Sequence, residues 1–347
     1  PPFQGGEAAY FMCANRNKRS LTLDLKSDRG RVLLGRLIQQ SDVVIENFKL
    51  GTLDSWGFDA DWFAKDAPRT IRCSITGYGS KGPKAHLPGY DFLAQAESGL
   101  MSICGPPDGD PVKYGVSIVD FCTGQIATIA ILSALQARHT TGRGQLVEAN
   151  LHSTGLSMLI NVGASHLMTG NPARRLGNGH PNAVPYREFT CSDGRLALPV
   201  GNDAQFARLA DAMGHPEWAD DPRLATMPQR VENREVVEAT LAPLFATRTV
   251  QDWLDALQAV GVPVSPIATV ADALADPHTK ASGMVTTMDH PTAGPVRTIN
   301  IPYALSETPA AITTPPPTLG QHNTEVLRDV LGLDVDEVDS LRRDGIV

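Results

Sequence analysis

Cysteine is scarce in this sequence, with five residues among 347. The five are scattered, odd in number and contain no Cys-x-x-Cys pair. That pattern disfavours a disulfide framework or a zinc site and favours a reducing compartment. We therefore expect no bound metal and a cytoplasmic location.

Long apolar runs are also missing. No stretch approaches the roughly 18 uninterrupted apolar residues of a membrane span, and we find no secretory signal. The formal net charge of -8 argues against non-specific binding to nucleic acid or to an anionic membrane. We therefore expect neither a membrane nor nucleic acid as a partner.

The overall composition is that of a globular protein, since 42% of the residues are hydrophobic and 20% are charged. Strand-like runs at 21–25, 43–45, 70–75 and 145–149 alternate with helical stretches. Alternation of this kind predicts βαβ units, and hence an α/β fold with a Rossmann-like parallel sheet. Ligands of such sheets bind at the carboxyl ends of the strands.

The predicted pattern of strands and helices changes after a loop rich in Gly, Pro, Asn and Arg at 170–185. A short strand near 196–200 and several amphipathic helices follow, which predicts a second, smaller α+β domain. We predict three segments: a large domain at 1–185, a small domain at 186–300 and a C-terminal segment at 301–347.

Asp120 lies where a predicted strand at 116–119 meets a nearly all-apolar stretch at 126–135, which we interpret as a buried helix. A carboxylate at a helix N-terminus is held ionised by the helix dipole and by free backbone N–H groups, as a nucleophile requires. Asp is also among the favoured N-cap residues, and on local evidence alone a simple cap is the commoner role. The local pattern leaves both interpretations open.

A glycine motif at 77–82 matches G-x-G-x-x-G and follows a predicted strand. A dinucleotide site also requires that the motif open a helix, whose N-terminus receives the pyrophosphate. Pro83, Pro88 and Gly89 indicate a continuing loop instead. We therefore expect no nicotinamide or flavin cofactor.

Sequence blocks along nearly the whole chain resemble the family III CoA-transferases, the formyl-CoA transferase-like family. The central block runs from Gly89 to Gln125 and contains Gly-Tyr-Asp, a glycine-rich turn and Asp120. Five further blocks follow the order of that family: 15–26, 42–48, 141–145, 201–202 and 319–322.

The resemblance implies roles for six residues. Asp120 matches the nucleophilic aspartate, which forms an acyl anhydride and then a CoA thioester, and Tyr90 matches a tyrosine that lines the active site. The remaining four match positions that hold the nucleotide end of CoA: Leu23, Lys26, Asn47 and Phe48. CoA is then a substrate, and no further cofactor is expected.

The resemblance also implies an interlocked homodimer, in which the C-terminal segment returns to the large domain. Members of the family begin with a further βα unit, which is missing before the first block here. A glycine-rich loop of the formyl-CoA enzymes is reduced to Gly201-Asn202. Together with the run at 174–180, this favours succinyl-CoA or another dicarboxylyl-CoA as the donor.

Two alternative functions remain. A 2-methylacyl-CoA racemase of the same fold needs a second general base. Racemases place a histidine where this chain has Tyr90 and a glutamate near the position of Ala204, so transfer is favoured. The other alternative is a CoA-binding protein without catalysis.

Overall fold

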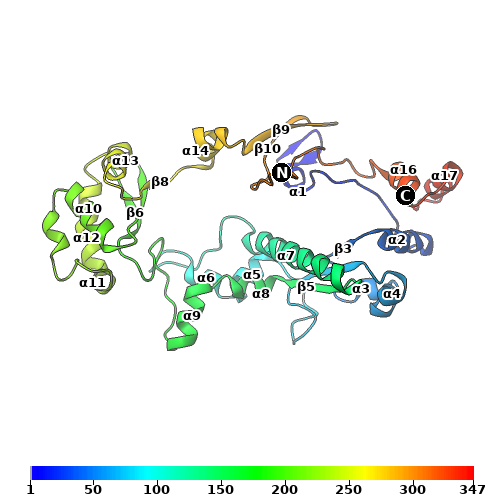
Figure 1. Ribbon diagram of the computed structural model, residues 1–347, viewed down its shortest axis with the longest axis horizontal. Helices are drawn as coiled ribbons and strands as arrows, with labels where there is room; N and C mark the ends of the chain where they lie inside the picture. The colour runs from blue at the N-terminus through cyan, green and yellow to red at the C-terminus, as the bar shows by residue number, and fades with distance from the viewer. Residues whose placement is uncertain (1) are drawn as a thin grey trace. The chain divides into compact units, whose positions relative to one another are not determined.

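The computed structural model describes residues 2–347 and contains two compact units (Figure 1). Unit 1 comprises Pro1–Ala94, Ser117–Ser157 and Asp272–Val347, and unit 2 comprises Gln95–Val116 and Met158–Ala271. The three segments predicted from the sequence stay a prediction.

A parallel three-stranded sheet lies at the centre of unit 1. Its strands are β3 (Val43–Glu46), β4 (Ile71–Thr76) and β5 (Leu146–Asn150), in the order β3-β4-β5. The short β-branched runs in the sequence form these strands, as expected of strands buried on both faces. The predicted α/β fold with a parallel sheet is thereby confirmed.

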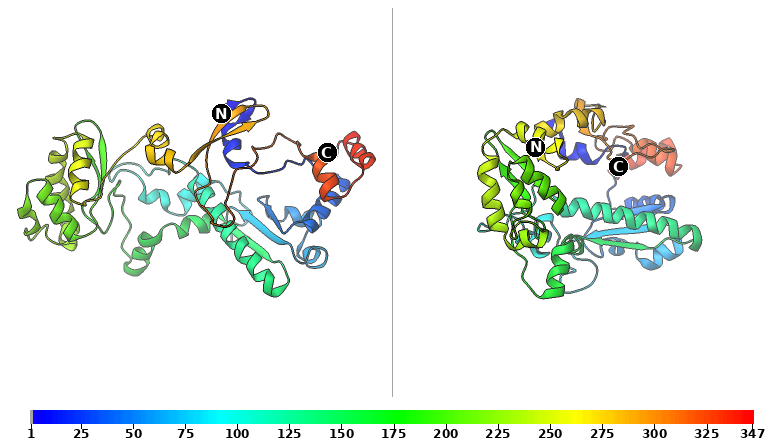
Figure 2. Two further views of the ribbon diagram at one scale, coloured as in Figure 1. Left: turned by 45° about the horizontal axis from the view of Figure 1, so that its top comes forward. Right: turned by 60° about the vertical axis from the view of Figure 1, so that its left-hand side comes forward.

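Helices cover both faces of this sheet. Val44 packs with Ile38 of α2 (Asp28–Gln40) on one face. Its neighbour Val43 points to the other face and packs in a cluster with Ala127 of α7 (Ile118–Thr141), because successive side chains of a strand alternate between faces. The right-hand view of Figure 2 shows α7 lying along the sheet.

Both covering helices end at the amino edge of the sheet. At the end of α2, the Thr70 hydroxyl donates to the carbonyls of Ile38 and Ser41, just before β4 begins. At the end of α7, Arg138 forms an ion pair with Asp42, just before β3 begins. The amino ends of α2 and α7 therefore lie toward the carboxyl edge, where such sheets bind ligands.

Two predicted features of the α7 region are wrong. Residues 116–119 form no strand, because α7 begins at Ile118. The helix is also not fully buried: Phe121, Ile129 and Leu132 are 60% exposed or more in the single chain. By length and composition alone α7 could cross a membrane, contrary to our expectation from the sequence, although one of its faces packs on the sheet.

The stretch at 21–25 forms no strand either. Its alternating leucines pack instead against the C-terminal helices, in a cluster that contains Leu23, Leu33, Leu327 and Leu341. The N–H of Asp24 donates to the carbonyl of Ile346 at 2.8 Å. The alternating pattern correctly indicated that these leucines are partly buried, but they pack against helices, and the segment pairs with no strand within residues 2–347.

Unit 2 contains an antiparallel sheet of β6 (Tyr186–Thr190), β7 (Arg195–Pro199) and β8 (Ser265–Pro266), beside which helices gather (Figure 2). Arg230 is fully buried there and donates to the carbonyls of Val184 and Leu224, which fixes the linker that enters the sheet.

The other elements are short or peripheral. They are β1 (Phe3–Gln4), β2 (Glu7–Ala8), α1 (Ala9–Ala14), α3 (Thr52–Ser55), α4 (Ala60–Asp66), α5 (Asp91–Glu97), α6 (Leu100–Ile103), α8 (Leu151–Ser157), α9 (Ile160–Thr169), α10 (Asp203–Ala212), the 3₁₀ helix η1 (Pro216–Ala219), α11 (Met227–Glu232), α12 (Arg234–Phe245), α13 (Val250–Ala259), α14 (Val270–Ala275), α15 (Pro277–Ala281), β9 (Val285–His290), β10 (Gly294–Ile299), α16 (Asn323–Glu325), the π-helical turn η2 (Val326–Val330) and α17 (Val335–Arg343).

Candidate active site

Asp120 is the third residue of α7, after the N-cap residue Ser117. The residue is exposed in the single chain, and its carboxylate makes no hydrogen bond or ion pair with any residue in the range 2–347. It therefore presents a carboxylate at the amino end of a helix directed toward the ligand-binding edge of the sheet.

The interpretation of Asp120 as the cap of α7 is wrong. The cap is supplied from 28 residues earlier in the chain, by the side chain of Asp91. Its Oδ1 accepts the N–H of Val119 at 2.8 Å and the N–H of Asp120 at 3.3 Å. Ser117 makes no side-chain cap bond. This role of Asp91 was not expected from the sequence, in which its only signal is its place after Tyr90 in Gly-Tyr-Asp.

The electrostatics of Asp120 differ from the expectation that the helix would hold it firmly ionised. Partial burial of the carboxyl group, followed by the negative charge of Asp91, raises the pKa of Asp120 above the ordinary 3.8. Both causes disfavour the charged form. A carboxylate with a higher pKa is more basic, and it is correspondingly a better nucleophile once ionised.

We expect this raised pKa to appear in the pH dependence of transfer. The nucleophile acts deprotonated, so kcat/KM should fall on the acid side at a higher pH than an ordinary aspartate would give. Asp91→Asn removes one of the two causes and should move this limb to lower pH. The test is to measure kcat/KM against pH for the wild type and for Asp91→Asn with the same donor, so that the titration of the donor itself cancels. Acid limbs that coincide in the two proteins would contradict this prediction.

Tyr90 reaches the site through a close backbone contact. It follows Gly89, which lies against Gly77 at the carboxyl end of β4: a Cβ on Gly89 would stand 2.2 Å from the Cα of Gly77. The Tyr90 side chain is 65% exposed, and Asp91 begins α5. No helix opens between Gly77 and Gly89, so the structure confirms that the glycine motif continues as a loop.

Asn47 and Phe48 directly follow β3, so they lie at the same edge of the sheet as the end of β4. Both are exposed, and the Phe48 ring meets the edge of Trp56 with ring centres 5.3 Å apart. The N–H of Phe48 donates to Glu46 at 2.8 Å, which fixes the turn after the strand. An exposed aromatic side chain and an amide are suited to a nucleotide base and its polar edge.

Leu23 and Lys26 precede α2, whose amino end also lies toward this edge. Leu23 is partly buried against the C-terminal helices, whereas Lys26 is exposed. Of the basic residues that we expected to form a positive patch, Arg19 forms an ion pair with Glu325 at 2.9 Å, and Lys18 donates to Asn15 at 3.0 Å. Within residues 2–347, the Lys26 ammonium has no such partner, so it is the best placed of the three to bind phosphate.

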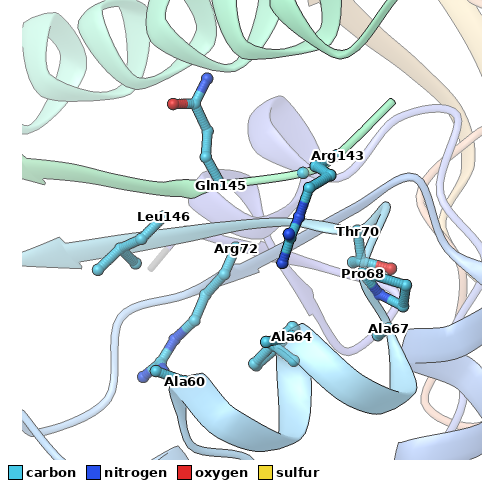
Figure 3. Close-up of a pocket in the computed structure, with 11 residues that line it drawn as sticks. Ala60, Ala64, Ala67, Pro68, Thr70, Arg72, Arg143, Gln145 and Leu146 are labelled. Atoms are coloured by element: carbon cyan, nitrogen blue, oxygen red, sulfur yellow. The ribbon is translucent and has the colours of Figure 1, made fainter. Parts of the chain in front are cut away.

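A cavity of about 180 Å³ occupies the opposite, amino edge of the sheet. Figure 3 shows Arg143, in the loop that leads into β5, extending toward α4, above Ala64. Of the lining residues, Thr70 lies just before β4 and Leu146 is the first residue of β5, so this cavity is not the expected ligand site. In the described part of the chain, no group of three or more His, Cys, Asp or Glu side chains could hold a metal ion.

This chain is thus an α/β protein with an exposed carboxylate, Asp120, and the exposed Tyr90 toward the carboxyl edge of a parallel sheet. Its fold is shared with known structures. A CAIB/BAIF family protein from Brucella suis is similar with a TM-score of 0.82 and 40% sequence identity, over 94% of this chain and 85% of that one.

The chain belongs to CoA-transferase family III, whose sequence pattern matches residues 1–323. It is 37% identical to a succinyl-CoA:glutarate CoA-transferase from Mus musculus, over 100% of this chain and 80% of the relative. It is 38% identical to a succinate–glutarate CoA-transferase from Agrobacterium fabrum, over 95% of this chain and 84% of the relative. The resemblance seen in the sequence is confirmed: the protein is an enzyme that transfers CoA between acyl-CoA and carboxylic acids.

Proposed function

We propose that this enzyme moves CoA from succinyl-CoA, or another dicarboxylyl-CoA, to a dicarboxylic acid, with Asp120 as the covalent nucleophile. The observation that carries the proposal is the unbonded carboxylate of Asp120 at the amino end of α7. The similarity to enzymes named for succinyl-CoA and glutarate supports the choice of substrates.

The chemistry needs no external acid or base. A carboxylate oxygen of Asp120 attacks the thioester carbonyl of the donor and the C–S bond breaks. CoA leaves as a thiolate, and the donor acyl group stays on Asp120 as a mixed anhydride. The thiolate then attacks the aspartyl carbonyl, which releases the donor acid and leaves an aspartyl-CoA thioester. The acceptor carboxylate reverses these two steps, so Asp120 is regenerated.

Tyr90 and the nucleotide-binding residues complete this proposal. The Tyr90 phenol donates a hydrogen bond to the oxyanion that develops in each attack. Asn47, Phe48, Leu23 and Lys26 hold the nucleotide end of CoA at the carboxyl edge. In this arrangement the thioester end of CoA lies at the amino end of α7, next to Asp120.

Isotope exchange tests the proposed reaction. Labelled succinate should enter succinyl-CoA in the presence of enzyme, and a panel of acids should rank dicarboxylates of four to six carbons above monocarboxylates. A racemase would exchange α-protons without any acid acceptor, and a protein that only binds CoA would do neither. The absence of exchange with every dicarboxylate offered would refute the proposed substrates.

We expect Lys26→Ala to weaken CoA binding without changing the fold. A hydrogen bond to a charged phosphate contributes about 1–3 kcal/mol, so the Kd should rise roughly 5- to 150-fold. Lys65→Ala is the matched control, because Lys65 is also exposed but lies in the last turn of α4, before the amino edge. If calorimetry finds equal CoA affinity in both variants, Lys26 does not bind CoA and this prediction is wrong.

We also propose that two chains interlock as a homodimer. Apolar side chains stay uncovered on two helices of the single chain: Phe121, Ile129 and Leu132 of α7 and Leu167 and Met168 of α9. Exposed apolar surface of this kind is typical of an interface. Sedimentation should show a dimer, and a stable folded monomer at nanomolar concentration would contradict the proposal.

A further inference from the structure

Asp91 connects two segments that the catalytic proposal needs together. It is the first residue of α5 and directly follows Tyr90. Its side chain is buried, with only 9% of the residue exposed, and it accepts the N–H groups of Val119 and Asp120. These are the second and third N–H groups of α7, the ones that a helix cap normally binds.

The segment that delivers Asp91 is anchored on the sheet. Gly89 and Gly77 approach so closely that neither could carry a side chain, since a Cβ on Gly77 would stand 2.5 Å from the Cα of Gly89. The carbonyl of Gly77 also accepts the N–H of His152 at 3.0 Å, at the start of α8. Asp91 is therefore held by backbone that is fixed between the ends of β4 and β5.

A carboxylate at the third helical position commonly turns back to the backbone of its own helix end, as in a capping box. In that motif the carboxylate accepts the N–H of the N-cap residue, which is Ser117 here, but the Asp120 carboxylate accepts no hydrogen bond within residues 2–347. The N–H groups of Val119 and Asp120 donate to Asp91 instead. The lone pairs of the Asp120 carboxylate therefore stay available for attack on a thioester.

We propose that Asp91 is a positioning residue for CoA transfer: it caps α7 from outside the helix and fixes the backbone of Asp120, whose carboxylate stays unbonded. This inference rests on Asp120 being the nucleophile. The negative charge of Asp91 also favours nucleophilic attack, because it contributes, after burial, to the raised pKa of Asp120 and so makes that carboxylate more basic.

Three variants test the positioning role. Asp91→Ala removes the acceptor, whereas Asp91→Asn keeps an Oδ1 that can accept both N–H groups, since Asn caps helices about as well as Asp. Asp59→Ala is the matched control: Asp59 caps α4 by accepting the N–H of Trp62 at 2.9 Å, so its loss removes a helix cap elsewhere in unit 1. Each variant is assayed for kcat, for the KM of succinyl-CoA and for thermal stability.

A misplaced nucleophile can cost about 10²-fold in rate, so Asp91→Ala should lose roughly that much kcat while KM changes less than about threefold. Asp91→Asn should recover kcat to within about tenfold of the wild type, because it restores the cap. Asp59→Ala should lower thermal stability and leave kcat within about twofold, because its cap lies outside the site. If Asp91→Ala loses no more kcat than Asp59→Ala, or if Asp91→Asn is as slow as Asp91→Ala, the positioning role is refuted.

A trapping experiment separates this outcome from failure of the proposed function. The wild-type enzyme, mixed with succinyl-CoA and quenched with hydroxylamine, should yield a hydroxamate on the peptide that contains Asp120. If that adduct forms while the Asp91 variants show no loss of kcat, only the positioning role is wrong. If no adduct forms on Asp120 during turnover, the nucleophile and the positioning role are wrong together.

Discussion

Asp120→Asn should abolish CoA transfer, with kcat lowered by roughly three orders of magnitude or more, as when other covalent catalytic residues are removed. An amide cannot form the acyl anhydride, so no intermediate accumulates. The fold should be nearly unchanged, because the Asp120 carboxylate accepts no hydrogen bond from any residue in the range 2–347. CoA binding should persist, because the proposed nucleotide contacts lie on other segments.

Asp336→Asn is the control for this variant, since Asp336 also lies exposed in the first turn of a helix, α17. The control should keep the kcat of the wild type. A purely structural Asp120 in the first turn of α7 would lose only a helix-dipole interaction of about 0.3–1 kcal/mol in Asp120→Asn, which would leave kcat unchanged. Turnover of Asp120→Asn near that of Asp336→Asn would therefore contradict the proposed mechanism.

The second large effect is expected from Gly89→Ala. The added Cβ would stand 2.2 Å from the Cα of Gly77 and 3.0 Å from its N, and this backbone cannot give way as the end of a flexible side chain could. Overpacking of this kind costs typically 1–3 kcal/mol of folding free energy. Because Tyr90 and Asp91 follow directly, the displacement should reach the amino end of α7 and lower kcat together with stability.

Gly115→Ala serves as the comparison, because a Cβ at Gly115 meets no heavy atom within 4 Å. Denaturant unfolding and steady-state kinetics of the two variants make the test. Gly115→Ala should resemble the wild type in both. If Gly89→Ala is as stable and as active as Gly115→Ala, the contact between Gly77 and Gly89 does not position the site.

The parallel sheet could be predicted because its signals are local. The runs at 43–45, 70–75 and 145–149 are short, β-branched or apolar and separated by helical stretches. Each therefore forms a strand close to its predicted limits. The carboxyl edge follows from the topology of such a sheet, so Asn47 and Phe48 could be placed at the ligand-binding edge without coordinates.

The start of α7 could not be predicted, because the group that sets it comes from elsewhere in the chain. Val116-Ser117-Ile118-Val119 has the composition of a strand. The helix begins at Ile118 because Asp91, 28 residues away from Val119, supplies the cap. Tertiary contacts of this kind override local propensity. They also explain why the pKa of Asp120 is raised, whereas the helix end alone was expected to lower it.

The apolar helix shows a second limit of sequence patterns. Hydrophobicity all around a helix predicts burial on every side. In the single chain, Val119, Ala127 and Ala134 are buried, while Phe121 and Ile129 on another face are exposed. The sequence thus indicates which faces of α7 are apolar, but only the structure shows which of these faces pack against other parts of the same chain.

Trapping of the covalent intermediate is the decisive experiment for Asp120 as the nucleophile. Enzyme is mixed with succinyl-CoA in the absence of an acceptor acid, quenched with hydroxylamine and digested, and its peptides are analysed by mass spectrometry. We expect a hydroxamate at Asp120 that is absent without donor and absent in Asp120→Asn. An adduct at another residue, or turnover with an unmodified Asp120 peptide, would contradict it.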